Sequence, residues 1–581
     1  MHMTSLKDIR WIFALGIGVV GFGFLYVTWK REQIFAERMR PLEAAMERLT
    51  AQPKATTEQV KFEQACDWSG IRSSLRDSVV QVFSHVAQFN WLEPYKTPNQ
   101  GQCAGSAFFI SATGDLITNA HVVDQAKAVF IQIPSQGKRR FEADVIGVSF
   151  ERDLALLRLK EHDVEAVKSS LGGVIPFMKF GDSDIVKGSE EIMTLGYPLA
   201  QQSLKGTTGI VSGREHMDGK HMIQISAPIN PGNSGGPSIN RNGLVIGVNT
   251  CGISVAQNVN YIVPSNEVKL FLEQLDKITP EFGTIKLLRK ITLGMIYHNA
   301  PDEVAHFLGN PVPGGMYVIA VAPGSLVESA GLMLGDMIYE INGLKIDSFG
   351  EISVPWSEDK VSVSDYVSRL VIGDIIKLKV YRKGTLLEPV INYLPTKASP
   401  IRRMYPGYEP IDYEIIGGMV VMPLSINLLQ AMISNVPELA KYADIKNQTE
   451  ELLIITHMMP DSVVVRARVI PVGAVFAEVN GLKVNTLADF RNALKASLSS
   501  GTLTITTSDN LMGVFDFGQI LKEEERLSRD YYYPITETVR ALRDTAALEK
   551  KSALSVPQPL PGGLQDAAGK ESAHQAVEAA A

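Results

Sequence analysis

The N-terminal part of the chain begins with a long apolar segment bounded by charges. Residues 11–29 contain no charged side chain and begin and end with Trp11 and Trp29. An α-helix needs about 20 such residues to cross a hydrocarbon core, and aromatic side chains favour both membrane interfaces. The charged run Lys30-Arg31-Glu32 follows in place of the small-residue cleavage site of a signal peptide. We therefore expect an uncleaved transmembrane helix over residues 11–29, after a short tail over residues 1–10.

In the next segment, residues 30–65, apolar residues recur at helical spacing with charged residues between them, and a polar stretch follows around Pro53. We expect a helical stalk and linker here. Basic residues are more numerous after the apolar segment than before it. Taken alone, the positive-inside rule would leave the C-terminal side of the predicted span in the cytoplasm.

From about residue 66 to about residue 276, short β-rich runs are broken by glycine, asparagine and proline. Val79-Val80-Gln81-Val82-Phe83 and Leu244-Val245-Ile246-Gly247-Val248 are examples. Such spacing predicts a two-barrel, all-β unit. The region ends in a predicted helix with Ser265 as its N-cap and an apolar face formed by Val268, Phe271, Leu272 and Leu275.

Two further units are predicted C-terminally, over residues 285–397 and 405–515. Leu293-Gly294-Met295-Ile296 resembles the carboxylate-binding loop of a PDZ domain, and Gly331 to Gly343 resembles its core hairpin. A PDZ domain binds a peptide as an added strand and holds its terminal carboxylate with backbone amides. Gly294, Met295 and Ile296 are therefore candidate carboxylate-binding residues.

The second of these units is an internal repeat of the first, but a divergent one. Gly417-Gly418-Met419-Val420-Val421 parallels Gly314-Gly315-Met316-Tyr317-Val318, and no clear carboxylate loop precedes Gly417. We expect a PDZ-like domain with a structural or assembly role in preference to peptide recognition. A helical extension over residues 516–550 and a disordered tail over residues 551–581 are predicted to follow, because the tail is rich in Ala, Gln, Gly and Pro.

Composition narrows the possible functions. The formal charge is −7, with 45% hydrophobic and 20% charged residues, so large apolar cores are possible and nucleic acid is not expected as a partner. Of the three cysteines, Cys103 and Cys251 could pair, but free thiols are favoured. The histidines form no ligand cluster in the sequence, so we expect no metal.

The chemistry is concentrated around Ser234. It lies in the run Asn230-Pro231-Gly232-Asn233-Ser234-Gly235-Gly236-Pro237, whose residues permit a sharp turn. Such a turn can direct the amides of Gly232 and Ser234 toward one developing oxyanion. A serine needs a base, and His121 and Asp153 precede it. The order His, Asp, Ser is that of the chymotrypsin-type triad.

These residues resemble the HtrA/Deg (DegP-like) family of trypsin-like serine endopeptidases. The matching stretches are Gly105 to Ile110, Thr118 to Val123, Asp153 to Leu157, Leu195 to Pro198, Thr208 to Ser212 and the run around Ser234. The resemblance implies that His121 is the general base, that Asp153 orients it and that Ser234 is the nucleophile. It also implies an oxyanion hole formed by Gly232 and Ser234, with Asn233 shaping the loop, and a reaction that needs no metal and no cofactor.

The substrate pocket is predicted from the same layout. In the chymotrypsin arrangement the residue six before the nucleophile forms the pocket floor, which is Pro228 here. Ser226-Ala227-Pro228 stands where the family usually has Asp-Ala-Ala. An uncharged floor offers no partner to a basic side chain. We therefore expect small or medium aliphatic residues before the cleaved bond, and the candidate pocket residues are Ile225, Ala227, Pro228, Ile229, Val248, Asn249 and Thr250.

Together these observations predict a mainly β, multidomain chain: a transmembrane helix, a chymotrypsin-like double β-barrel and two PDZ-like domains. The family resemblance implies hydrolysis of unfolded or damaged proteins for quality control, and C-terminal peptides as further partners. It also implies a homo-oligomer, trimeric or a multiple of trimers, and a protease domain on the extracytoplasmic, periplasmic side. The alternative is a non-proteolytic chaperone or scaffold that keeps the fold and binds peptides.

Overall fold

The computed structural model describes residues 67–217, 220–252, 258–396 and 399–554 of the chain. The predicted transmembrane helix over residues 11–29 and the stalk over residues 30–65 lie outside the described residues. Within those ranges, no helix combines the length and the apolar character that a membrane crossing requires.

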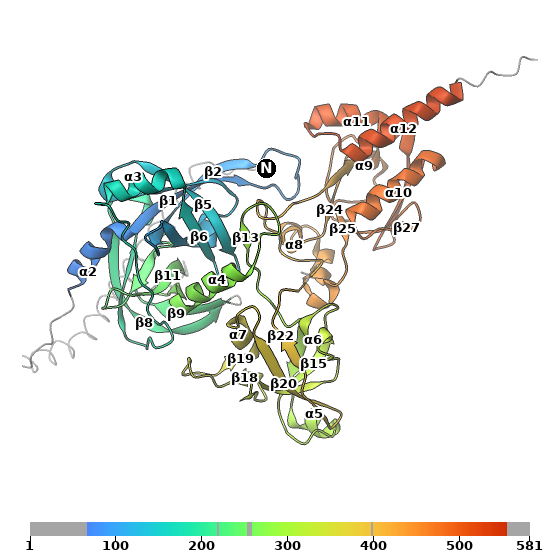
Figure 1. Cartoon of the computed structure of the whole chain (residues 1–581). Helices are drawn as coiled ribbons and strands as arrows, with labels where there is room; N and C mark the ends of the chain where they lie inside the picture. The colour runs from blue at the N-terminus through green and yellow to red at the C-terminus, as the bar shows by residue number, and fades with distance from the viewer. Residues whose placement is uncertain (1–66, 218–219, 253–257, 397–398, 555–581) are drawn as a thin grey trace, which may run out of the picture. The chain divides into compact units, whose positions relative to one another are not determined.

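The first barrel follows a short helix, α2 (Trp68–Leu75), and closes because β5 pairs with both β4 and β6. Its strand order is β5-β4-β1-β2-β3-β6. Figure 1 labels four of these strands, β1, β2, β5 and β6. Val80 and Val82, two positions apart on β1, both point into its core because alternate side chains share one face of a strand. Its strands are β1 (Val79–Gln88), β2 (Asn99–Phe109), β3 (Asp115–Thr118), β4 (Ala126–Gln132), β5 (Arg140–Ser149) and β6 (Leu154–Leu159), and helix α3 (Glu161–Ser170) follows.

The second barrel is closed in the order β10-β11-β12-β9-β8-β7. Its strands are β7 (Glu191–Gly196), β8 (Lys205–Met217), β9 (Lys220–Ile225), β10 (Pro237–Ile239), β11 (Val245–Gly252) and β12 (Asn260–Pro264). The predicted mainly β fold with a double barrel is confirmed. Cys103 on β2 is a free thiol, so no disulfide joins it to Cys251.

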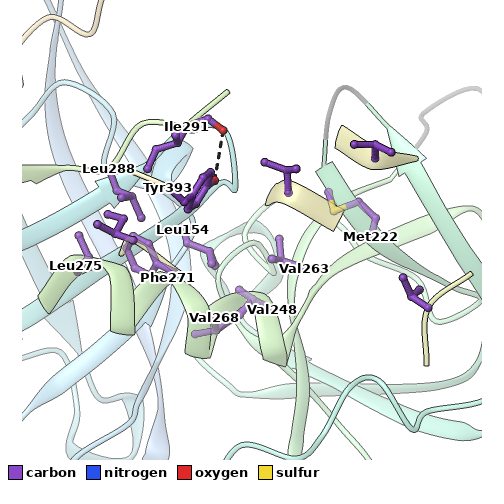
Figure 2. Packing of buried hydrophobic residues seen from close by; sticks show 14 of the residues in the cluster. Leu154, Met222, Val248, Val263, Val268, Phe271, Leu275, Leu288, Ile291 and Tyr393 are labelled. Carbon is purple, nitrogen blue, oxygen red and sulfur yellow. Dashed lines mark hydrogen bonds between the residues drawn. The ribbon is translucent and has the colours of Figure 1, made fainter. Parts of the chain in front are cut away.

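Helix α4 (Ser265–Lys277) packs the predicted apolar face against the protein. Figure 2 shows Val268 beside Val248 of the second barrel, while Phe271 and Leu275 lie near Leu288; all belong to one buried cluster. The predicted cap is wrong: Pro264 is the N-cap residue, and the Ser265 hydroxyl instead donates to the carbonyl oxygen of Gly181 at 3.1 Å. Ser265 is fully buried, and this bond satisfies its hydroxyl.

The first C-terminal unit comprises β14 to β22 and three short helices. Its main strand order is β14-β15-β16-β20-β21, so β14 is an edge strand among the described residues. A two-residue strand, β13 (Lys286–Leu287), precedes the unit and pairs with β5. The elements are β14 (Met295–Asn299), α5 (Asp302–Phe307), β15 (Met316–Val321), α6 (Leu326–Ser329), β16 (Met337–Ile341), β17 (Leu344–Lys345), β18 (Glu351–Ile352), β19 (Val361–Ser362), α7 (Val363–Ser368), β20 (Ile375–Arg382), β21 (Thr385–Leu387) and β22 (Val390–Asn392).

The second C-terminal unit has two small sheets, β23-β24-β25 and β27-β26-β28-β29, and ends in two helices. Its elements are β23 (Glu414–Ile416), β24 (Met419–Pro423), α8 (Ile426–Met432), β25 (Leu453–Met458), α9 (Val463–Ala467), β26 (Phe476–Val479), β27 (Leu482–Lys483), α10 (Leu487–Ser500), β28 (Thr502–Thr507), β29 (Met512–Asp516), α11 (Phe517–Tyr531) and α12 (Glu537–Leu554). Its core is separate from the one around α4.

The two C-terminal units share one internal construction. Asn342 follows β16 and its side-chain oxygen accepts from the amide of Lys377; Asn480 follows β26 and accepts from the amide of Thr504 in the same way. This part of the predicted repeat, ending in Asn342-Gly343 and Asn480-Gly481, has the same structure in both units.

The other half of the predicted repeat was aligned wrongly. Gly418 is the counterpart of Gly294, not of Gly315. Both have a left-handed φ, +77° at Gly294 and +80° at Gly418, and an added Cβ would meet the Cβ of Ser325 or Ser462 at 2.3 and 2.4 Å. Each of these serines caps the following helix. The second unit therefore has a loop in the carboxylate-loop position, and sequence similarity alone paired that loop with the wrong glycines.

Candidate active site

His121 and Asp153 meet at the end of two neighbouring strands. His121 lies in a single helical turn (Ala120–Val122) after β3, and Asp153 immediately precedes β6, which pairs with β3. Imidazole Nδ1 lies 2.9 Å from each carboxylate oxygen of Asp153, and the backbone amide of His121 also donates to Oδ1 at 3.1 Å. These contacts fix both the position and the ring orientation of the histidine.

The carboxylate of Asp153 is buried, with 9% of its side chain exposed. Burial alone would raise its pKa, but hydrogen bonds and charge from His121, together with the Thr250 hydroxyl, hold the pKa of Asp153 below its usual range. An ionised acid at this place stabilises a positive imidazole. Asn119 adds a bond from its side-chain amide to the Asp153 carbonyl oxygen at 2.9 Å, which supports a residue with φ of +56°.

Ser234 lies in the loop between β9 and β10. Its hydroxyl donates to the carbonyl oxygen of Thr250 at 2.9 Å, whereas no hydrogen bond between Ser234 and His121 is present in the described residues. The Thr250 hydroxyl in turn donates to Oδ2 of Asp153 at 2.5 Å. The structure thus brings Ser234 and Asp153 together through Thr250, with the serine hydroxyl turned to a carbonyl oxygen.

The serine loop is packed tightly on the first barrel. The carbonyl oxygen of Ser234 accepts from the amide of Ser106 at 2.8 Å. A Cβ added at Gly105 would lie 2.8 Å from the side chain of Val122 and 3.2 Å from the Ser234 carbonyl oxygen. Because Val122 directly follows His121, the absence of a side chain at Gly105 allows the histidine and serine loops to approach each other.

The predicted oxyanion loop, Gly232, Asn233 and Ser234, forms a defined turn. The amide of Asn233 donates to the Asn230 carbonyl oxygen at 2.9 Å, and Gly232 has φ of +99°. Pro231 then Gly232 at the two central positions is typical of a type II turn. The amides of Gly232 and Ser234 have no acceptor among the described residues, so both are available to a ligand oxygen.

Ser106 holds this turn and was not predicted as part of the site. Its buried hydroxyl donates to the Gly232 carbonyl oxygen at 2.7 Å and accepts from the amide of Tyr197 at 3.0 Å. Gly232 has no room for a side chain, because a Cβ there would lie 2.5 Å from the Tyr197 carbonyl oxygen. The signal in the sequence is the pair of runs Gly105-Ser106 and Gly196-Tyr197, which match the family but do not by themselves indicate this contact.

The candidate pocket residues fall into separate groups. Ile225 and Ala227 are fully buried in an apolar cluster of the second barrel, with Ile229 at its edge, whereas Pro228 is exposed. Val248 is buried beside α4 (Figure 2). The alternation of β9 directs Ile225 inward, and a sequence cannot show which face of a strand is the interior.

The two polar members of the predicted pocket have structural contacts. The Asn249 side chain donates to the Leu195 carbonyl oxygen at 3.0 Å and accepts from the Ser238 hydroxyl at 2.7 Å. Its backbone also bonds the loop that carries Ser234, through Gly235 and Gly236. Asn249 and Thr250 thus support the serine and the acid, a role that the sequence did not indicate.

The predicted carboxylate loop of the first C-terminal unit has free donors. The Gly294 carbonyl oxygen accepts from Ala322 at 2.8 Å, which anchors the loop, while the amides of Leu293 and Gly294 have no acceptor among the described residues. Met295 and Ile296 begin β14, whose outer edge is unpaired in the described sheet. This arrangement can accept a carboxylate and an added strand.

Comparisons with known proteins agree with this geometry. Residues 105–248 match the family model of a trypsin-like peptidase domain, and residues 406–537 match that of a PDZ domain. The chain is 31% identical over 296 residues to a probable periplasmic serine endoprotease DegP-like of Marinomonas sp., covering 49% of this chain and 56% of that protein. To the protein of the same name from Chlamydia pneumoniae it is 28% identical over 423 residues, covering 70% of this chain and 74% of the relative.

A solved structure gives a weaker match. The HtrA-type protease AlgW with decapeptide is 22% identical, with a TM-score of 0.44, and is matched over 57% of this chain and 100% of its own. Across the two curated relatives described above, the match spans between about half and three quarters of their length.

Proposed function

Because this chain belongs to the HtrA/DegP family of trypsin-like serine endopeptidases, we propose that it hydrolyses peptide bonds of unfolded or damaged proteins through Ser234. The observation that carries this proposal is the set of contacts among His121, Asp153, Thr250 and Ser234. They join a nucleophile, an oriented base and a buried acid at the junction of two barrels.

The reaction begins with a turn of one hydroxyl. Ser234 Oγ leaves the Thr250 carbonyl oxygen and donates to Nε2 of His121, which takes its proton as Oγ bonds to the scissile carbonyl carbon. Asp153 stabilises the imidazolium that results. His121 then gives the proton to the leaving amine as the C–N bond breaks, and water hydrolyses the acyl-enzyme by the same route.

The negative oxygen of the tetrahedral intermediate is bound by the amides of Gly232 and Ser234. The turn that presents them is already held by Ser106 and by its own internal hydrogen bond. Preorganised donors of this kind lower the barrier because they need no reorientation as charge develops; each is worth roughly 10²–10³ in rate.

We also propose a preference for small or medium aliphatic residues before the cleaved bond. Pro228 provides no charge at the predicted floor, and Ile229 beside it is apolar and half-buried. The first C-terminal unit is proposed to act as a PDZ domain that binds apolar C-terminal peptides through Gly294, Met295 and Ile296. The free amides of its loop support this role.

The cellular setting is proposed as well. The apolar run over residues 11–29 supports a single-pass anchor. The curated relatives from Marinomonas and Chlamydia are named as periplasmic, which supports an extracytoplasmic protease domain. We further propose a homo-oligomer, trimeric or a multiple of trimers, and a role in protein quality control under stress.

A second function, a non-proteolytic scaffold, is favoured by one observation: the Ser234 hydroxyl is bonded to Thr250 and not to His121. The discriminating experiment compares wild type with Ser234→Ala on unfolded casein. The protease account expects hydrolysis to fall by roughly 10⁴–10⁶-fold while casein binding persists. Ser74→Ala, on an exposed face of α2, is the matched control. Equal casein degradation by wild type and Ser234→Ala would overturn the assignment.

A further inference from the structure

The second C-terminal unit has a carboxylate loop, and that loop is already filled by the protein itself. Gly417 is the counterpart of Leu293, because each directly precedes the matching loop glycines Gly418 and Gly294. The Leu293 amide has no acceptor in the described residues, whereas the Gly417 amide donates to Oε1 of Glu524 at 2.5 Å. A side-chain carboxylate from α11 thus lies where a peptide terminus would bind.

Glu524 is held as a buried ligand. It is fully buried, and its other oxygen, Oε2, accepts from the Tyr533 hydroxyl at 2.8 Å. A buried carboxylate is costly unless its oxygens are hydrogen-bonded. Here one oxygen is satisfied by the loop and the other by the chain just after α11, so the helix is tied to the loop through this one side chain.

The place of the peptide strand is filled too. In the first unit β14 is the edge strand, but in the second unit its counterpart β24 pairs with β25 on one side and with β23 on the other. The strand β23 runs antiparallel to β24 and toward the glycine loop, in register from Glu414 with Val421 to Ile416 with Met419. That is the direction of a bound C-terminal peptide.

Side chains of β23 complete the resemblance to a ligand. Ile416 belongs to the apolar cluster that contains Phe490 and Leu494 of α10, where a peptide's last side chain would be anchored. The strand is clamped from α10 by Arg491, whose guanidinium donates to Glu414 at 2.8 Å and to the Tyr413 carbonyl oxygen at 3.1 Å. Glu414 is itself fully buried.

We propose that the second unit is an internally liganded PDZ fold, in which β23 replaces the peptide strand and Glu524 replaces the peptide's terminal carboxylate. It does not bind C-terminal peptides, and its loop instead anchors α11. Peptide recognition is then confined to the first unit, a statement that rests on the proposed function of that unit.

The experiment is hydrogen–deuterium exchange of the full chain in a Ser234→Ala background. The probe is a decapeptide ending in valine with a free carboxylate, and its C-terminal amide is the control. The peptide is expected to slow exchange over residues 293–299 and to leave residues 417–423 unchanged. Protection of residues 417–423 by the free-carboxylate peptide would overturn the proposal. Absence of protection at residues 293–299 would count only against the first unit.

Variants of Glu524 test the internal ligand without any peptide. Glu524→Ala should raise exchange over residues 417–421 and in α11 at least about tenfold, as expected when 1.4 kcal/mol or more of local stability is lost. Glu524→Gln, which keeps an acceptor oxygen, should stay within about twofold of the parent by the same measure. Acetate matches the group removed in Glu524→Ala and should restore protection there, while chloride at equal ionic strength should not. Unchanged exchange in Glu524→Ala, or no effect of acetate, would contradict the proposal.

Discussion

The hydroxyl of Thr250 donates to Oδ2 of Asp153 at 2.5 Å, and the backbone carbonyl oxygen of Thr250 accepts from the Ser234 hydroxyl. One residue of β11 therefore contacts both ends of the proposed catalytic triad. Its hydroxyl satisfies an oxygen of a buried acid, and its carbonyl holds the nucleophile in the state that the structure describes.

Removing the Thr250 hydroxyl should reduce the stabilisation of the Asp153 carboxylate while leaving that carboxylate in place. Thr250→Val leaves Oδ2 of Asp153 without this donor, so we expect kcat to fall about ten- to a hundredfold, the cost of one hydrogen bond to a charged group. KM should change little. Thr250→Ser keeps the donor and should restore kcat to within about twofold by the same reasoning. Initial rates on a fluorogenic peptide measure this, and equal rates for the valine and serine variants would contradict it.

Replacing the Asp153 carboxylate by a neutral amide should lower kcat far more. Asp153→Asn can no longer fix the imidazole in the required tautomer or stabilise its positive charge, so kcat should fall by roughly 10³–10⁴-fold near neutral pH. Asp144→Asn is the control, because the Asp144 side chain is exposed on β5 of the same barrel. A loss of less than tenfold in Asp153→Asn, with the fold intact, would count against the assignment.

The turn after the nucleophile leaves no room for a side chain at Gly235. Its φ is +86°, and an added Cβ would lie 2.1 Å from the Ser106 carbonyl oxygen. Gly172 has φ of +81° and nothing within 4 Å of its Cβ position. Gly172→Ala should thus cost only the strain of the left-handed backbone, about 1–2 kcal/mol. Gly235→Ala should cost about 3 kcal/mol or more and abolish activity.

Chemical denaturation followed by circular dichroism measures the two free energies of unfolding. Because both glycines have nearly the same φ, the difference between their alanine variants isolates the collision with Ser106 and Thr118. Similar losses in the two variants would mean that backbone strain, and not close packing of the serine loop, decides the effect.

The buried carboxyl of Glu524 makes the second C-terminal unit sensitive to pH. Burial raises the pKa of Glu524 to about 7, although the hydrogen bonds from Tyr533 and Gly417 act to lower this pKa. Arg543 lowers the pKa of this carboxyl further and Glu414 raises it. The folded unit therefore holds a proton that the unfolded chain has already lost. The stability that this proton contributes is complete below about pH 4.5 and is lost as the pH rises to about 7. The free energy of unfolding then falls by up to about 3 kcal/mol.

Exchange of the β24 amides, corrected for the intrinsic rate, measures this change in opening free energy. Glu524→Gln should remove the dependence between pH 5 and pH 8. Glu525→Gln is the control on the same helix. The Arg543 guanidinium holds the pKa of Glu525 below its usual range, so any effect of this carboxyl on the pH dependence of stability is confined to pH values below about 4.5. A wild-type unit that gains stability between pH 5 and pH 8 would contradict the account.

Much of this architecture could be predicted from local signals. Short β-rich runs broken by turn residues predicted the barrels. The turn around Gly232 and the order of His121, Asp153 and Ser234 indicated one site although the three residues are far apart in the chain. Hydrogen bonds made by a buried hydroxyl cannot be predicted from a local sequence pattern. Ser106 under the oxyanion turn and the hydroxyl of Thr250 on Asp153 depend on how separate strands come together.

Two other failures have a physical cause as well. The sequence could not show that Ile225 and Ala227 face the interior of the second barrel, because alternation fixes the period of a strand and not its inward side. The loop at Gly417 was missed because its partner, Glu524, is distant in the chain. Only the fold brings that carboxylate to the Gly417 amide.

The most direct test of the central claim is covalent labelling by a fluorophosphonate, which reacts with a serine activated by a neighbouring base. Mass spectrometry should locate the label on Ser234 in wild type, with none in Ser234→Ala and at least about a hundredfold slower labelling in His121→Ala. Labelling in protease-shaved vesicles also reports on which side of the membrane the site lies. An unlabelled Ser234 in protein that still degrades casein, or unchanged labelling in His121→Ala, would contradict the account.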